Sequence, residues 1–122
     1  MSNQSIVRLH AKASVNPNDW ETFKQMVSAT KIIVAKEGPE AVLLHECYYD
    51  LETFECLIIE GYADEAAFLS HLELIKPLSS KYQVDWKIER LELLGPYSEN
   101  VVAAMRAGNE HAFSHYSASL NI

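Results

Sequence analysis

The chain has 122 residues, of which 48% are hydrophobic and 22% are charged, and its formal net charge is -7 at pH 7. This length and composition are typical of one globular domain with a hydrophobic core, and the acidic balance disfavours nucleic acid and anionic membranes as partners. No apolar run approaches the roughly 18 residues of a membrane span, and residues 1–5 are polar, unlike a secretion signal. We therefore expect a cytoplasmic protein.

The sequence begins with a predicted strand and a long helix. Residues 6–13 alternate between apolar and polar side chains, as a half-buried strand does. The helix is expected to start after Asn18, where Glu21 completes a capping-box pattern. It should end near Lys36, because Gly38 can take the left-handed position that closes a helix.

A hairpin is predicted next, because residues 41–50 and 53–61 read as strands with a short connection. If residues 51–52 form a two-residue turn, Cys47 lies directly across from Cys56. Two reduced core thiols are the simpler interpretation, and a cross-strand disulfide or redox pair is the alternative. The pairing depends on loop length, because a one-residue change moves side chains to the other face.

A second helix and a last strand complete the predicted core. Asp64 can cap the helix, which runs to about Ile75, and residues 77–81 form a further helical turn. Residues 84–94 are predicted as the last strand, with Trp86 and Arg90 on the same face.

The predicted order is β-α-β-β-α-β, which is an α+β ferredoxin-like plait over residues 1–96, with two helices on one face of an antiparallel sheet. The other face carries too many large apolar groups to be solvated in a monomer. We therefore expect a homodimer that forms a dimeric α+β barrel by packing two sheets face to face.

Residues 97–122 form a C-terminal extension. Ser98 can cap a short helix that Gly108 would end. Residues 109–122 have no clear period, so this tail is expected either to pack over the partner subunit or to stay disordered.

The candidate catalytic residues are Glu60, Tyr62 and His71. His71 lies on the apolar stripe of the second helix, and an imidazole there can act as an acid or base near neutral pH. Glu60 ends the preceding strand and Tyr62 follows it, so a carboxylate, a phenol and an imidazole can face one space. A core histidine with one hydrogen bond, a solvated carboxylate and a boundary tyrosine are the structural alternatives.

The candidate substrate-binding residues are His10, His45, Phe68 and Trp86. Three of them are mid-strand residues that could line the open face of the sheet, and Phe68 lies on the apolar stripe of the second helix. Alternation alone does not fix which face is which, and packing is the alternative role for each. Arg8 and Arg90 can pair with carboxylates or hold an anionic substrate.

The sequence offers no metal or cofactor signature. His111 and His115 have a spacing that suits a metal only on a helix, and no third ligand lies nearby. His45 and Glu46 fail as a pair, because neighbours in a strand point to opposite faces. Without a phosphate loop or a Cys-x-x-Cys motif, an enzyme built on this chain is expected to work without a bound cofactor.

The chain resembles the antibiotic biosynthesis monooxygenase family of dimeric α+β barrels, which includes quinol monooxygenases. The residues that carry the resemblance are the block Glu60-x-Tyr62-x-Asp64-Glu65-x-Ala67-x-x-x-His71 and the hairpin Glu46-Cys47-Tyr48-Tyr49-Asp50, followed by Phe54. The similarity covers residues 6–94 and excludes the tail.

Two departures from the family pattern matter. Tyr62 stands where many members have Trp, and a Glu-x-Tyr version is similar to autoinducer-processing isomerases of the same superfamily. The haem-degrading branch fits less well, because it has a Trp at the position of His71 and a His at the position of Lys81.

The resemblance implies a cofactor-independent monooxygenase that oxygenates a small aromatic or quinol-like substrate with dioxygen. In that mechanism a base, here His71, removes the substrate proton, while Tyr62 and Glu60 orient the substrate or the base. Two alternatives remain open: an isomerase of a small carbonyl compound that uses the same acid–base set, and a dimeric module that binds a ligand without turnover.

Overall fold

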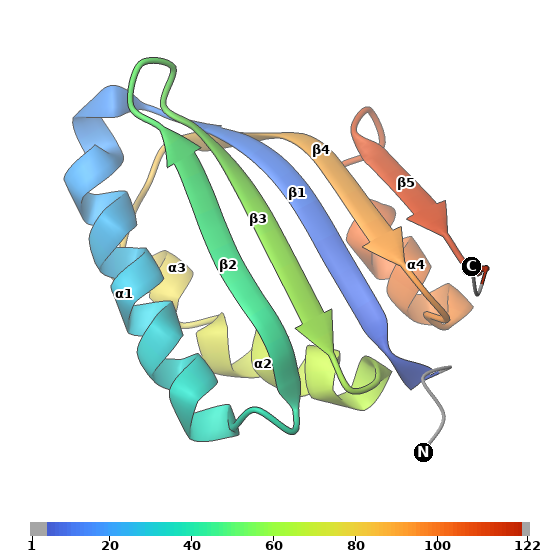
Figure 1. Ribbon diagram of the computed structural model, residues 1–122. Coiled ribbons are helices and arrows are strands. Elements are labelled where there is room, and N and C mark those ends of the chain that lie inside the picture. The colour runs from blue at the N-terminus through green and yellow to red at the C-terminus, as the bar shows by residue number, and fades with distance from the viewer. Residues whose placement is uncertain (1–4, 121–122) are drawn as a thin grey trace.

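The computed structural model describes residues 5–120, and its elements follow the predicted order (Figure 1). The elements are β1 (Val7–Val15), a short 3-10 turn η2 (Pro17–Asp19), α1 (Trp20–Glu37), β2 (Val42–Asp50), β3 (Glu55–Tyr62), α2 (Glu65–Ile75), α3 (Leu78–Lys81), β4 (Trp86–Leu94), α4 (Glu99–Arg106) and β5 (Phe113–Tyr116). No helix within this described range is long and apolar enough to cross a bilayer.

The five strands form one sheet in the order β2-β3-β1-β4-β5. The first four are antiparallel to their neighbours, and β5 pairs in parallel with β4. The helices cover one face of the sheet and leave the other open (Figure 1). The predicted α+β ferredoxin-like fold is therefore confirmed, and the unpredicted strand β5 makes the sheet mixed.

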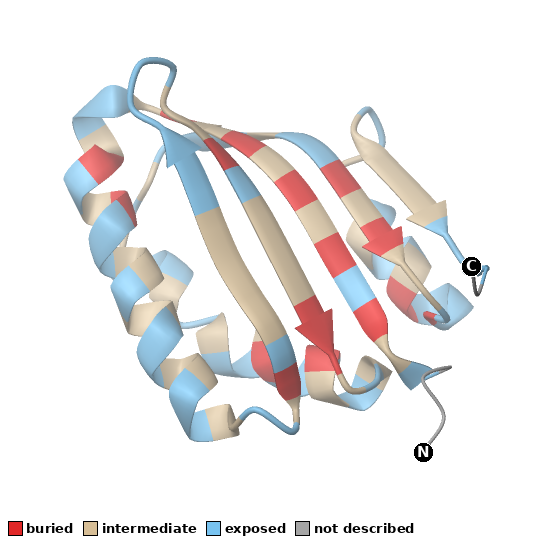
Figure 2. Cartoon of the chain, viewed as in Figure 1, coloured by how far each residue is buried: buried red, intermediate tan, exposed pale blue. Residues whose placement is uncertain are grey.

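The alternation along β1 separates the two faces. Val7, Leu9, Ala11, Ala13 and Val15 are at most 7% exposed, and the residues between them are half-buried or exposed (Figure 2). We call the face beneath the helices the covered face and the opposite one the open face. The period of two in the sequence thus predicted β1 and its sides correctly.

The β2–β3 hairpin corrects the predicted register. Asp50 pairs with Glu55, and Cys56 lies opposite Tyr49 instead of Cys47. The loop is two residues longer than predicted, because Phe54 adopts a left-handed conformation with φ 58° and donates its N–H to the Asp50 carbonyl at 2.8 Å. A shift of two residues keeps both thiols on the covered face in diagonal positions, and both are free.

Two further predictions were wrong in detail. The pairing of β1 with β4 shifts by one residue at Lys12/Ala13, so Trp86 shares the covered face with Leu91 while Arg90 lies on the open face. Asn18 does not cap α1: it lies inside η2, where its N–H bonds to the Asn16 side chain at 2.9 Å, and α1 begins at Trp20.

The other helix ends follow the sequence signals. Asp64 accepts a hydrogen bond from the Ala67 N–H at 2.8 Å and caps α2. Ser98 accepts one from the Val101 N–H and caps α4. Gly38 closes α1 with φ 91°, a conformation that costs glycine little.

The C-terminal extension packs on the same core as the rest of the chain. Val101 of α4 belongs to the cluster that contains Leu91 and Leu93 of β4. The Tyr97 hydroxyl donates to the Arg8 carbonyl at 2.7 Å. Gly95 is required at the junction, because a Cβ there would lie 2.8 Å from the Ile6 carbonyl oxygen. Residues 121–122 of the predicted tail lie outside the described range, and its association with a partner stays a prediction.

Candidate functional site

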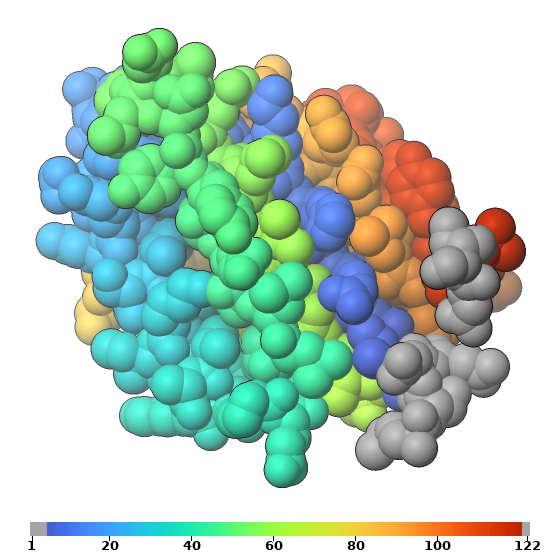
Figure 3. Space-filling model, viewed as in Figure 1, coloured from blue at the N-terminus to red at the C-terminus, as the bar shows by residue number. Residues whose placement is uncertain are grey.

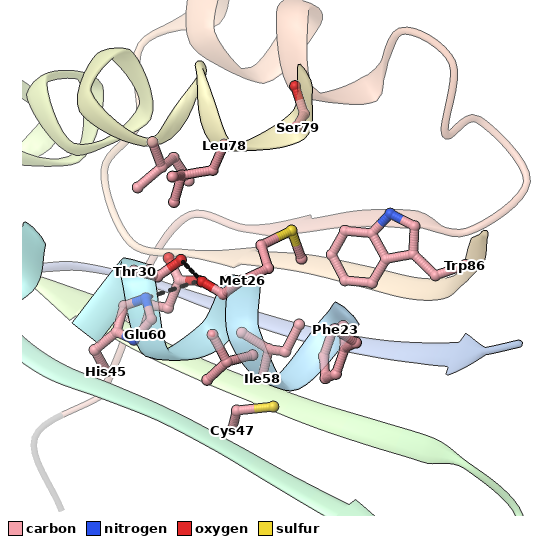
Figure 4. Close-up of a pocket in the computed structure, with 12 residues that line it drawn as sticks. Phe23, Met26, Thr30, His45, Cys47, Ile58, Glu60, Leu78, Ser79 and Trp86 are labelled. Carbon is pink, nitrogen blue, oxygen red and sulfur yellow. Dashed lines mark hydrogen bonds and ion pairs between the residues drawn. The ribbon is translucent and has the colours of Figure 1, made fainter. Parts of the chain in front are cut away.

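A cavity of about 190 Å³ lies between the covered face and helices α1, α2 and α3. Its lining is mostly apolar, and each layer contributes: Phe23, Met26, Val27 and Thr30 from α1, His45 and Cys47 from β2, Ile58 and Glu60 from β3, Ile75, Leu78 and Ser79 from α2 and α3, and Trp86 from β4. His45 and Glu60 lie side by side at one end, and Trp86 and Phe23 lie at the other (Figure 4). The cavity is thus an apolar pocket with one polar end.

His71 lies beneath this polar end and is completely buried. It is the only histidine or charged side chain among residues 5–120 that is fully buried. Its Nδ1 lies 2.7 Å from a carboxylate oxygen of Glu37, the last residue of α1. A carboxylate can only accept, so Nδ1 carries the proton and Nε2 keeps its lone pair. Nε2 is buried and has no hydrogen-bond partner.

Glu60 and Tyr62 form a second buried pair. They occupy alternate positions of β3, so both face the helices, and the Tyr62 hydroxyl donates to the Glu60 carboxylate. Burial raises the pKa of Glu60, against the opposing effects of the Tyr62 hydrogen bond and of His71. Burial and the Glu60 charge raise the pKa of the Tyr62 hydroxyl, so it remains a hydrogen-bond donor.

His45 completes the polar end from β2. Its Nε2 is 3.7 Å from the second oxygen of Glu60 and also lacks a hydrogen-bond partner. The Lys31 ammonium group reaches it from α1, with Nζ 3.3 Å from Nδ1 and also bonded to the His45 carbonyl. Burial, followed by the nearby charges of Lys31 and His71, lowers the pKa of His45 to about 4, so its imidazole is neutral at neutral pH.

The three residues His45, Glu60 and His71, which we call the His–Glu cluster, present ligand atoms within 4.8 Å of one another. The rings of His45 and His71 have centroids 5.3 Å apart, and the Tyr62 ring is 5.4 Å from His71. The structure thus brings together the three residues predicted as catalytic, and adds His45. A base with a free lone pair and a carboxyl group with a raised pKa form an acid–base set.

The predicted substrate-binding residues separate into three environments. His45 and Trp86 line the cavity. Phe68 is fully buried and packs edge-on against Tyr62, so it supports the site from the core. His10 lies on the open face, in a separate pocket that Arg90 also lines. The functional roles of all four residues stay predictions.

The charged and histidine candidates outside the cavity are dispersed. Arg8 pairs with Gly61 and Leu94, so it lies on the open face like Arg90. His111 is in a turn, and His115 is in β5, where its Nε2 contacts the Gly95 carbonyl at 2.9 Å. The helical spacing that a metal pair at these two residues would need is therefore not present.

Glu37 and Lys31 are the site residues that the sequence interpretation missed. Glu37 ends a helix, and its partner His71 is 34 residues away in the chain. Lys31 is 14 residues from His45. In the sequence, both residues resemble ordinary polar residues of an amphipathic helix. Only the packing of α1 against β2 and α2 places their side chains at the cavity.

The similarity of the chain to known proteins is structural. No family model and no curated protein matches the sequence. MupZ from Pseudomonas fluorescens has a TM-score of 0.76 at 18% identity, over 97% of this chain and 93% of that one. Two proteins named "Putative antibiotic biosynthesis monooxygenase" match over 75% of this chain: one from Bacteroides thetaiotaomicron (TM-score 0.59, 22% identity, 88% of that chain) and one from Caulobacter crescentus (TM-score 0.57, 16% identity, 89%).

These comparisons establish the fold. The chain has the α+β fold of antibiotic biosynthesis monooxygenase-like proteins, as its resemblance to that family predicted. The match to MupZ spans nearly the whole chain and therefore includes α4 and β5. At these identities the activity has to be argued from the site itself.

Proposed function

We propose that the protein oxygenates a small aromatic, quinol-like substrate with dioxygen and without a cofactor, using His71 as the general base. The observation that carries this proposal is the buried imidazole of His71. Its Nδ1 is held by Glu37 at 2.7 Å, and its Nε2 lone pair is free. The apolar lining of the adjacent cavity suits a flat, weakly polar molecule.

The first step is removal of the substrate hydroxyl proton by His71 Nε2. His71 is fully buried and does not itself line the cavity, so this step requires the substrate hydroxyl to enter between His45 and Glu60. The Glu37 carboxylate stabilises the imidazolium that forms, and it fixes the tautomer that exposes Nε2. The surrounding apolar side chains exclude water and leave the phenolate electron-rich. His45, which lines the cavity, would hold the substrate oxygen near the base, and Tyr62 would orient Glu60.

The second step uses the electrons of the substrate to reduce dioxygen. The phenolate transfers one electron to dioxygen, and the ring radical and superoxide combine to form a carbon–oxygen bond. The O–O bond of this peroxide then breaks as the ring carbon loses its hydrogen, which leaves a carbonyl on the ring. The Glu60 carboxylate takes the hydrogen lost from the ring carbon as a proton and passes it to the departing oxygen. That oxygen takes its second proton from His71 and leaves as water, so the products are a quinone and one water.

Dioxygen uptake tests this proposal. Purified protein, treated with a chelator and free of flavin, would be given a panel of quinols and polyphenols. We expect uptake above autoxidation that falls by at least about 100-fold in His71→Ala and is unchanged in His111→Ala, a substitution in an exposed turn. Equal uptake by the wild type and His71→Ala would overturn the assignment of the base.

The proximity of an acid to a base favours a second candidate, an isomerase. Glu60 and His71 lie in one cluster, as enolisation of a carbonyl compound requires. Arg8 and Arg90 lie on the open face, so a phosphorylated substrate is disfavoured. Exchange of solvent deuterium into a small ketone under anaerobic conditions would identify this activity. Aromatic ligand binding without uptake or exchange would indicate a binding module.

We also propose that the protein forms a homodimer through its open face. Within residues 5–120 no helix crosses this face (Figure 1), and the space-filling view from the same side shows atoms of the strands at its surface (Figure 3). Tyr48 is 54% exposed and Leu57 is 50% exposed on it. The half-buried side chains of Ile59 and Leu94 lie on the same face. An apolar surface of this kind is typical of an interface between subunits.

A further inference from the structure

Two buried imidazole nitrogens and a carboxylate meet at the polar end of the cavity. We propose that His45, Glu60 and His71 form a binding site for a divalent first-row transition metal ion. The ligands would be Nε2 of each histidine and the Glu60 oxygen that faces His45. No short sequence motif marks this set, because its members come from β2, β3 and α2.

The chemistry of the donors determines which ion the site would take. Two neutral imidazoles and one carboxylate suit Zn²⁺, Fe²⁺ or Co²⁺, whereas Mg²⁺ and Ca²⁺ prefer ligand sets made only of oxygen. Three protein ligands leave at least one coordination position free, as in catalytic sites. His45 and Glu60 line the cavity, so that free position would face the space proposed for the substrate.

The three ligand atoms would have to move only a short distance toward one another to bind an ion. The ligand atoms lie within 4.8 Å of one another, and His45 Nε2 is 3.7 Å from Glu60. An ion bound at about 2.1 Å from each ligand in a tetrahedral arrangement places those atoms about 3.4 Å apart. Side-chain rotations that draw the atoms inward by up to about 1.4 Å would therefore complete the site.

The hydrogen-bond pattern provides an independent argument. Nε2 of His45 and Nε2 of His71 are the only buried side-chain nitrogens or oxygens without a partner among the described residues. Buried polar atoms normally have a hydrogen-bond partner, so two buried nitrogens without one in the same cluster require an explanation. A metal ion would satisfy both at once.

Neighbouring groups hold two of the three ligands in the required orientation. Glu37 accepts the Nδ1 proton of His71 at 2.7 Å and directs the Nε2 lone pair inward. Tyr62 donates to one oxygen of Glu60 and leaves the other free. Carboxylates and hydroxyls that orient ligands in this way are typical of the outer shell of metal sites.

Lys31 opposes the metal-bound state. Its ammonium group can only donate, so at 3.3 Å it favours the His45 tautomer that carries the proton on Nε2. Lys31 lies on the exposed side of α1 and can rotate away from His45. Removing its charge would therefore free Nδ1 to carry the proton and Nε2 to bind the ion, which gives a substitution expected to tighten binding.

This inference does not rest on the proposed oxygenation. A bound ion would occupy the lone pair of His71 that the oxygenation mechanism uses, so the two states exclude each other. Metal binding can be measured without any substrate, and uptake can be measured in chelator-treated protein. Failure of either proposal is then seen without reference to the other.

The test is a titration of chelator-treated protein with Co²⁺, followed by visible absorption and by competition with Zn²⁺. We expect one saturable equivalent in the wild type. Affinity should fall at least about 100-fold in His71→Ala and His45→Ala, and should rise about 10-fold in Lys31→Ala. His10→Ala is the matched control, because it removes a histidine from the open face of the same sheet, and its affinity should equal that of the wild type.

Two results would overturn the proposal. One is the absence of saturable binding in both the wild type and Lys31→Ala. The other is binding that His45→Ala leaves intact, because a surface site would then account for it. Circular dichroism checks that each variant is folded. If His71→Ala does not fold, His45→Ala and Lys31→Ala decide the question through their opposite expected effects.

Discussion

The same residue types are paired across strands on both faces of the sheet, with different consequences. His45 lies opposite Glu60 on the covered face, and His10 lies opposite Glu92 on the open face. The side chains of His45 and Glu60 are only 8% and 13% exposed, and burial lowers the pKa of the first to about 4 and raises that of the second. His10 and Glu92 instead line a separate pocket on the open face, which the helices do not cover. Position relative to the helices, more than residue type, therefore decides which pair can do chemistry.

Adjacent leucines on β4 offer the sharpest test of the two faces. Leu93 is completely buried on the covered face, whereas Leu94 is half-buried on the open face. We expect Leu93→Ala to lower the free energy of unfolding by about 3–4 kcal/mol, because it leaves a cavity in the core. Leu94→Ala should cost about 1 kcal/mol. Urea unfolding measures both, and equal losses would contradict the division into a covered and an open face.

The two glutamates test the comparison through activity. Glu60→Gln removes the acid beside His71 and should lower turnover by about 100-fold. Glu92→Gln makes the same change on the open face and should leave turnover within about twofold of the wild type. Initial rates on the substrate found by dioxygen uptake measure both variants. A loss of similar size in Glu92→Gln would mean that the open face takes part in catalysis.

The open face is expected to act in assembly, and Leu57 probes that role. An aspartate at this position would bury a charge between the two sheets, so Leu57→Asp should weaken dimerisation by about 30-fold. Leu74→Asp is the matched control, because Leu74 is similarly exposed, at 49% against 50%, but lies on α2. Sedimentation velocity over a range of concentrations measures the effect. A wild type that stays monomeric would contradict the proposed dimer.

Local patterns predicted the elements, but contacts between distant parts of the chain set their details. The period of two gave β1, and Asp64 marked the start of α2, because strand alternation and capping are local signals. The hairpin loop was predicted too short, since nothing local indicates that Phe54 takes a positive φ. Strand β5 was missed because it has only four residues and forms by pairing with β4.

The site, like the fold, was predictable where the signal was local and not where it depended on contacts between distant parts of the chain. His71 stood out as a histidine on an apolar helical stripe, and Glu60 stood out at the end of a strand. The choice between His10 and His45 needed the sheet topology, because alternation separates two faces without saying which one the helices cover. Glu37 could not be found, because its partner lies on another helix.

Glu37 is therefore the most informative of the missed residues. Glu37→Gln keeps an oxygen that can accept the Nδ1 proton of His71 but removes the charge that stabilises the imidazolium. We expect kcat to fall about 10-fold with KM unchanged. Glu40→Gln makes the same change at an exposed position and should have no effect. If KM rose while kcat held, Glu37 would act in substrate binding instead.

The two thiols divide the covered face itself into accessible and inaccessible parts. Cys47 lines the cavity, whereas Cys56 is 1% exposed. The neighbouring Cys56 thiol lowers the pKa of Cys47, and the Cys47 thiol together with burial raises the pKa of Cys56. Iodoacetamide should therefore alkylate Cys47 at least about threefold faster, because the thiolate is the nucleophile. Peptide mass spectrometry measures both rates, with denatured protein as the control, where the rates should converge. An aromatic ligand in the cavity should protect Cys47, and faster labelling of Cys56 would contradict the placement of the cavity.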